Sequence, residues 1–359
     1  MPELEPAERN QTADLLKGLA VVLMIQVHLV EQFATLDLFE SAVGQISLFL
    51  GGPPAAPVFL AVMGYFLARS PRSAVSLVKR GVLLVIGGIL LNLGLNANLL
   101  YAIHQGRFTL EPLAFIFGAD ILPAAGLSII LVAIGRTYAR ARVLPYILAA
   151  CSIAGATPLL STIAAEPTSI AIKYTLPFFF GNSWWSYFPL FPWFAYPLLG
   201  VAFANASGLR SRFLSLPTTY RWLAVGTLSA TLLLTLPFAL ANIIELHSYY
   251  HHDIRLMIWI CGFLFVWLMM MKSAERQFGT SAAFRYLKWL GRNVTSAYVF
   301  QWLLIGNIAT EIYRTQDLKQ LAFWFFGIMA ATTLLTYAFQ SARRIFKRTR
   351  KSKDHANAE

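Results

Sequence analysis

Three ionisable side chains, Lys17, His28 and Glu31, stand in the first apolar segment of the chain. Ionisable groups at membrane depth are rare and are functional candidates by default. Lys17 and His28 are eleven residues apart, almost a whole number of helical turns, so a helix would carry both on one face about 16 Å apart. Glu31 follows His28 at i+3, close enough to touch the imidazole. One elongated ligand lying along this face would meet a cation at one end, and at the other an imidazole with a carboxylate beside it.

This arrangement favours acyl transfer. A separation of about 16 Å suits the pantetheine arm of coenzyme A, with Lys17 near the phosphates. His28 would act as the general base that takes a proton from an acceptor hydroxyl or amine, while Glu31 fixes its tautomer and stabilises the imidazolium. Two simpler explanations stay open: Lys17 extends its ammonium to the membrane surface, and His28 forms an interhelical hydrogen bond.

The composition is that of a membrane protein. Of the 359 residues, 57% are hydrophobic and 13% charged, against about 25% charged in soluble domains. Apolar segments of about 20 residues recur between short polar gaps, the pattern of helices that cross a bilayer. We therefore predict an all-α, polytopic protein of the cell (inner or plasma) membrane, with a single transmembrane domain at 1–342 and a basic cytoplasmic tail at 343–359. A homo-oligomer is compatible with this pattern.

We predict about ten transmembrane helices, at residues 14–34, 47–69, 80–101, 115–135, 143–164, 188–206, 222–243, 254–272, 288–309 and 321–342. Five of the 29 Lys and Arg residues fall in one set of alternate gaps, namely Arg107, Lys173, Arg255, Arg314 and Lys319. The others fall in the opposite set or at the chain ends. By the positive-inside rule both termini are cytoplasmic. The net charge of +12 is explained by these helix-end residues, which argues against a nucleic-acid partner.

Three further residues are candidates for the same chemistry. Asp120 is expected near the outer end of the fourth helix, at a depth comparable to Glu31, where it would orient the acceptor or share the histidine; capping of the helix is the open alternative. Arg80 and Arg292 lie at inner helix ends and would hold CoA phosphates. For either arginine taken singly, setting the membrane orientation by charge is the simpler explanation.

The outer gaps are aromatic and polar. Asn182 and Trp184 would hydrogen-bond and stack on a sugar, although an aromatic membrane belt accounts for most such residues. Residues 51–57 (GGPPAAP) lack several backbone donors, so they either shape a tunnel beside His28 or merely kink the helix. No metal is expected, because the zinc-capable side chains of one outer gap lack the spacing of a recognised site; these are His247, His251, His252 and Asp253.

A basic residue, ten intervening residues and a histidine in the first helix resemble the hallmark of integral-membrane acyltransferases, including the acyltransferase type 3 family. Lys17 stands where arginine is commoner. More of the chain resembles bacterial relatives of the heparan-α-glucosaminide N-acetyltransferase catalytic domain. The similar stretches lie at 14–20, 28–31, 56–64, 79–84, 91–93, 120–122, 188–193 and 291–293.

The resemblance implies a membrane enzyme that takes an acyl group, usually acetyl, from cytoplasmic acyl-CoA to an acceptor, often a sugar, on the far side. Acetyl-CoA would be the co-substrate. Two positions depart from the families' pattern. Gln301 stands before Trp302 where a second histidine is common, and glutamine cannot titrate but can hydrogen-bond a substrate. Lys17 keeps the charge of arginine without its bidentate fork.

Two other classes of function are alternatives. A transporter or flippase for a sugar or lipid-linked substrate also suits many helices with buried Pro, Gly and carboxylates. The two halves of the chain show no matching broken segments, which counts against it. A membrane scaffold without chemistry would leave His28 and Glu31 unexplained.

Overall fold

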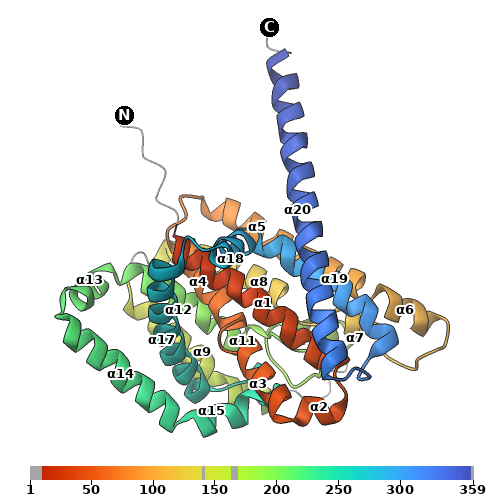
Figure 1. The fold of residues 1–359 in the computed structure, drawn as a ribbon, viewed down its shortest axis with the longest axis horizontal. Coiled ribbons are helices and arrows are strands. Elements are labelled where there is room, and N and C mark those ends of the chain that lie inside the picture. The colour runs from red at the N-terminus through yellow and green to blue at the C-terminus, as the bar shows by residue number, and fades with distance from the viewer. Residues whose placement is uncertain (1–9, 140–141, 163–168, 357–359) are drawn as a thin grey trace.

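The computed structural model describes residues 10–139, 142–162 and 169–356. Arg9, Arg140, the end of the predicted fifth helix at 163–164 and tail residues 357–359 lie outside this part of the chain. Within the described residues the protein is all-helical and has no strand, apart from one isolated parallel bridge between Ala34 and Gln316 (Figure 1). The predicted all-α class is confirmed.

The helices follow one another with short connections. They are α1 (Gln11–Phe33), α2 (Leu36–Glu40), α3 (Ala42–Gly51), α4 (Ala56–Ala68), α5 (Ala74–Leu95), α6 (Ala97–His104), α7 (Pro112–Ile116), α8 (Ile121–Ala139), α9 (Leu144–Thr162), α10 (Ile170–Thr175), the 3₁₀ helix η1 (Leu176–Phe178), α11 (Leu190–Trp193), α12 (Ala195–Asn205), α13 (Ser207–Ser215), α14 (Thr218–Leu234), α15 (Leu236–Ile243), α16 (Leu246–Tyr250), α17 (Ile254–Phe278), α18 (Ala282–Arg292), α19 (Val294–Ile312) and α20 (Leu318–Ala356).

Seven helical segments in the described residues are long and apolar enough to cross a membrane: α1, α3 with α4, α5, α8, α9, α17 and α20. The protein is therefore a multi-pass membrane protein. The pair α14 and α15 makes an eighth span if it is counted as one, but it bends by 58°. Pro237 in the first turn of α15 explains the break, because proline has no backbone N–H to continue the helix.

The predicted count of ten spans is not confirmed. The predicted sixth span corresponds to a shorter apolar helix, Leu190–Asn205. The predicted ninth span is divided between α18 and α19, and α19 carries the polar residues Gln301, Asn307 and Glu311. The start of α1 and the end of α20 lie on the same side of the helical body (Figure 1), as an even number of crossings requires. Which side is cytoplasmic stays a prediction.

α1 lies at the centre of the fold. Of its apolar stretch, 67% is buried, against 22% for each of α5, α9, α17 and α20. It packs against α3, α4, α17, α18, α19 and α20. The polar side chains of α1 therefore face protein rather than lipid, which is where polar groups of a transmembrane helix are tolerated.

The start of α1 crosses α18 at two glycines. A Cβ atom on Gly18 would lie 1.8 Å from the carbonyl oxygen of Leu287, and one on Gly291 would lie 1.8 Å from the carbonyl oxygen of Asp14. Small residues allow helix backbones to approach this closely in membranes. This crossing positions the end of α1 that carries Lys17.

α20 is the longest helix, with 39 residues, and is therefore about 58 Å long. It projects well beyond the other helices (Figure 1). Up to Ala356, the segment predicted as a basic tail at 343–359 continues this helix.

Candidate active site

His28 lies in the second half of α1 and is enclosed by other helices. Its ring packs against the indole of Trp302 on α19, with centroids 4.0 Å apart and planes inclined by 32°. The Nδ1 atom is buried and has no hydrogen-bond partner among the described residues. A buried polar atom without a partner costs free energy, so this nitrogen is a candidate for contact with a substrate.

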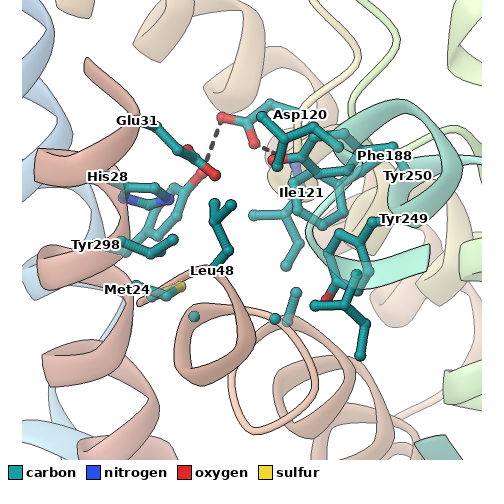
Figure 2. A pocket seen from close by; sticks show the side chains of 16 residues that line it. Met24, His28, Glu31, Leu48, Asp120, Ile121, Phe188, Tyr249, Tyr250 and Tyr298 are labelled. Atoms are coloured by element: carbon teal, nitrogen blue, oxygen red, sulfur yellow. Dashed lines mark hydrogen bonds between the residues drawn. The ribbon is translucent and has the colours of Figure 1, made fainter. Parts of the chain in front are cut away.

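His28 lines a cavity of about 30 Å³ together with Glu31, Asp120 and Tyr298, a space for about two water molecules. Figure 2 shows the Glu31 and Asp120 side chains converging on one end of it. The remaining wall is apolar or aromatic: Met24, Val27, Leu48, Gly51, Gly52, Ala56, Ile121, Phe188, Ile243, Leu246, Tyr249 and Tyr250. Two carboxyl groups and an imidazole thus share one small chamber.

Asp120 is fixed by two hydrogen bonds. The hydroxyl of Tyr298 on α19 donates to Asp120 Oδ2 at 2.8 Å, and the backbone N–H of Ile121 donates to Oδ1 at 2.6 Å. Asp120 therefore both satisfies a donor at the start of α8 and lines the cavity with His28. The two roles that the sequence left open are compatible with each other.

The loop that carries Asp120 is held from both sides. The buried side-chain amide of Asn92 on α5 donates to the carbonyl of Gly118 at 2.8 Å. The backbone N–H of Phe188 donates to the carbonyl of Ala119 at 2.6 Å. Because buried backbone groups are satisfied in this way, the loop presents Asp120 in one defined position.

The break between α3 and α4 lies against α1 beside His28. A Cβ atom on Gly51 would lie 2.2 Å from the Cβ atom of Val27, so only glycine fits there. The hydroxyl of Ser47 donates to the Gln26 side chain at 2.6 Å, and the Gln26 amide donates to the carbonyl of Ser47 at 3.0 Å. This segment forms part of the cavity wall. Its position agrees with the predicted alternative that the segment shapes the site rather than only kinking the helix.

Sequence reasoning did not single out the aromatic residues that close the cavity, Phe188, Tyr249, Tyr250 and Tyr298. The rings of Phe188 and Tyr250 are 5.2 Å apart, and those of Tyr249 and Tyr250 are 5.5 Å apart. Burial raises the pKa of Tyr250 well above its usual value, so its hydroxyl stays protonated as a hydrogen-bond donor. The Tyr249 hydroxyl is buried with no partner in the described part of the chain.

A family model described as heparan-alpha-glucosaminide N-acetyltransferase, catalytic, matches residues 9–234. The chain belongs to this family. Membership indicates a transmembrane acetyltransferase, and the matched region holds His28, Glu31 and Asp120. No curated protein and no solved structure gave a match. Helices α15 to α20 lie beyond the matched residues.

In this member of the family, Lys17 forms an ion pair with a carboxylate of its own helix. Its ammonium donates to Asp14 Oδ1 at 2.8 Å, its side chain is 18% exposed, and it lies 5.8 Å from the centre of the Phe66 ring. α1 is continuous from Gln11 to Phe33, so the separation of about 16 Å between Lys17 and His28 holds. A phosphate at Lys17 would have to compete with Asp14.

The other two predicted CoA contacts are exposed arginines. Arg292 follows Gly291, which packs against Asp14, and therefore lies at the same end of α1 as Lys17. Its Nε donates to the carbonyl of Lys288 at 3.1 Å. Arg80 projects from α5, which packs mainly against α8. The structure brings Arg292 near the start of α1, whereas Arg80 belongs to a different helix pair.

The predicted sugar contacts are not assembled at His28. Asn182 is exposed, and Trp184 packs edge-on against Phe115 and Trp185 at 5.3 and 5.5 Å. Neither lines the cavity. Gln301 is fully buried on α19 beside Trp302, and both its side-chain amide atoms lack a partner within the described ranges.

No group of three His, Cys, Asp or Glu side chains able to hold a metal ion is found among the described residues. His252, one of the zinc-capable side chains, is instead used in packing. Its Nε2 lies 2.8 Å from the hydroxyl of Tyr196, and its Nδ1 lies 2.7 Å from the carbonyl oxygen of Tyr249. Since a carbonyl can only accept, Nδ1 carries the proton and Tyr196 donates to Nε2.

Proposed function

We propose that the protein transfers an acetyl group from cytoplasmic acyl-CoA to a hydroxyl or amine of an acceptor, a saccharide, on the extracytoplasmic side, with His28 as the base. One observation carries the proposal. The Nδ1 atom of His28 is buried without a partner among the described residues, in a chamber that also holds the carboxyl groups of Glu31 and Asp120.

In the proposed step His28 takes the proton of the acceptor O–H or N–H. The acceptor atom forms a bond to the thioester carbonyl carbon, and the bond between that carbon and the CoA sulfur breaks. The thiolate leaves and takes up the proton from the imidazolium, so no net charge is left on the protein. Proton transfer by a positioned side chain contributes about 10²- to 10⁴-fold to the rate.

The neighbours of His28 have separate roles in this proposal. Glu31, one turn away on α1, stabilises the imidazolium that forms. No hydrogen bond joins His28 to Glu31 among the described residues, so this role is electrostatic. Asp120, fixed by Tyr298, orients the acceptor. Trp302 holds the imidazole ring in place by packing against it.

The proposed membrane orientation completes the mechanism. With both termini cytoplasmic, Lys17 lies with the acyl-CoA pool and His28 lies toward the outer side, so the thioester end of the donor reaches the acceptor side. A chamber of about 30 Å³ is far smaller than ordinary ligand sites of about 300–1,000 Å³. Acceptor entry therefore displaces part of the aromatic wall, for which Tyr249 and Tyr250 on the short helix α16 are the proposed elements.

The test is acetyl transfer by the purified protein. Labelled acetyl-CoA is incubated with a panel of amino sugars and glycans, and the label is followed into product. His28→Ala is expected to lower turnover by at least about 100-fold, while His104→Ala, an exposed histidine on α6, is expected to leave it unchanged. Retained turnover in a folded His28→Ala protein would overturn the proposed base. Protein-bound label that is present in the wild type and absent from His28→Ala would indicate a covalent acyl-histidine.

The broken spans favour one competing function. The bend between α14 and α15 and the short non-helical stretch between α3 and α4 resemble the discontinuous helices of transporters. A sugar transporter or flippase would move labelled substrate across proteoliposomes without any acyl donor. Movement without acetyl-CoA, combined with no transfer in its presence, would replace the acetyltransferase proposal.

A further inference from the structure

A second cavity, of about 740 Å³, lies apart from the His28 chamber. Its walls come from the start of α1 and from α4, α12, α13 and α17, and it shares no lining residue with the chamber. Its volume falls within the range of about 300–1,000 Å³ that is typical of ligand sites. The proposed acetyl transfer makes no use of it.

The wall of this cavity is almost entirely apolar, with Val58, Val62, Leu199, Leu264 and Leu268 among its residues. The polar hydroxyl of Tyr196 in the wall is already bonded to His252. Near the opening, Leu209 and Leu214 are 63% and 46% exposed. Apolar surface of this extent is stable when a hydrocarbon chain covers it.

The charged groups of the cavity are both positive. Arg210 and Lys272 line it, and no Asp or Glu is among the lining residues. Lys272 has no ion pair or hydrogen bond within the described ranges. Arg210 donates to the carbonyl of Phe203 and lies 4.8 Å from the centre of that ring, which leaves further guanidinium donors for a ligand. The cavity thus presents a cationic rim without a compensating anion.

The polar groups are segregated from the apolar wall. Asn10 caps the start of α1, Thr12 belongs to its first turn, Arg210 to α13, and Lys272 to the last third of α17. In the proposed orientation these positions all border the cytoplasmic surface. Trp267, which also lines the cavity, has a buried indole N–H that finds no acceptor in the described part of the chain. Tryptophan at this depth commonly contacts lipid head groups.

We propose that this cavity binds an anionic phospholipid, with its phosphate at Arg210 and Lys272 and its acyl chain along α4, α12 and α17. The charge of the rim and the apolar wall match the two parts of such a lipid. Basic pockets between transmembrane helices on the cytoplasmic side recognise acidic head groups in this way. The inference is independent of the acetyl-transfer proposal, because no residue is shared between the two sites.

Lipid retention by the full-length protein tests the proposal. The protein is reconstituted into phosphatidylcholine nanodiscs with increasing dioleoyl phosphatidylglycerol, and retained lipids are counted by native mass spectrometry. R210Q/K272Q is expected to weaken phosphatidylglycerol retention by about fivefold for each charge removed, or roughly 25-fold in total. The matched control R212Q/R276Q removes two charges from the same helices at exposed positions that do not line the cavity, and it is expected to behave as wild type.

Three results would overturn the inference. Equal loss in the control variant would show an effect of bulk charge. Undiminished retention in R210Q/K272Q would show that the rim does not bind the phosphate. Glycerol phosphate or palmitoyl-CoA binding as tightly as dioleoyl phosphatidylglycerol would assign the cavity to a free phosphate or to an acyl donor instead. A Val62→Phe variant that narrows the cavity supplies a second measurement, and it is expected to lower retention while leaving acetyl transfer intact.

Discussion

Replacing Gly18 by alanine perturbs the crossing of α1 and α18, on which the position of Lys17 depends. The new Cβ atom would lie 1.8 Å from the carbonyl oxygen of Leu287 and 2.6 Å from its carbonyl carbon. These are backbone atoms and cannot rotate away. To reach ordinary C···O contacts of about 3.3–3.6 Å, the two helices have to separate by roughly 1.5 Å.

The expected cost follows from overpacking. Inserting a methyl group into a well-packed interior typically costs about 1–3 kcal/mol of the free energy of unfolding. Unfolding of the purified protein in mixed micelles, followed by far-ultraviolet circular dichroism, measures this cost. Since a misplacement of about 1 Å can lower a catalytic rate by about 100-fold, acetyl transfer is expected to fall together with stability.

Gly87→Ala is the matched control. Gly87 lies within α5, and a Cβ atom there would meet no heavy atom within 4 Å. Alanine is also the better helix former, by about 1 kcal/mol, so this variant is expected to be as stable as the wild type or slightly more stable. The difference between the two alanine variants isolates the steric cost of the crossing. If Gly18→Ala unfolds at the same denaturant concentration as Gly87→Ala, the close approach of α1 and α18 is refuted.

Gly291→Ala provides an internal check, because its Cβ atom would meet the carbonyl oxygen of Asp14 at the same crossing. Once one methyl group has separated the helices, the second costs less. The double variant G18A/G291A is therefore expected to be less destabilised than the sum of the single variants, as for residues that share one contact. Strict additivity would indicate two independent sites.

Three further outcomes are expected. Tyr298→Phe removes the hydrogen bond to Asp120 and is expected to lower acetyl transfer while the protein stays folded; unchanged kinetics would show that this bond does not position Asp120. Gln301→Leu replaces a buried amide that lacks partners among the described residues. The variant is expected to raise the free energy of unfolding by about 1–3 kcal/mol. A lower acceptor affinity in the same variant would support substrate binding at this position. Burial opposes the charge of Asp253, but the hydrogen bond from Arg255 and the backbone donors of α17 outweigh it and lower the pKa of Asp253 below its usual value. The ionised carboxylate of Asp253 therefore contributes its full stability above the pKa of the unfolded state, about 3.9. This contribution is lost as the pH falls through the lower pKa of the folded state. Asp253→Asn, which still caps the helix, is expected to make unfolding less dependent on pH in that acidic range.

Much of the central helix was predictable from the sequence. The spacing of Lys17, His28 and Glu31 is a local property of one helix, and α1 runs unbroken from Gln11 to Phe33. The break at Gly51 was also predictable, because glycine and proline set backbone conformation locally. The number of spans was less predictable, because hydropathy alone does not show that α19 is separated from α18 or that α14 and α15 bend apart.

The partners of Asp120 were not predictable. Tyr298 is 178 positions away in the chain, and their contact depends on how α8 and α19 pack around α1. Two aromatic outer gaps looked equivalent in the sequence, yet Tyr250 closes the cavity while Trp184 stays exposed. The difference arises from the path of the chain between α15 and α17, which no local pattern encodes.

By itself, the sequence determined the membrane-spanning, all-helical class of the protein and the side chains that share a face of α1, because hydropathy and helical periodicity act within about 20 residues. Only the tertiary structure decided which distant groups complete the chamber around His28. The burial of its Nδ1 atom and the hydrogen bond from Tyr298 to Asp120 arise from packing between helices far apart in the chain, and packing of this kind depends on shape rather than on pattern.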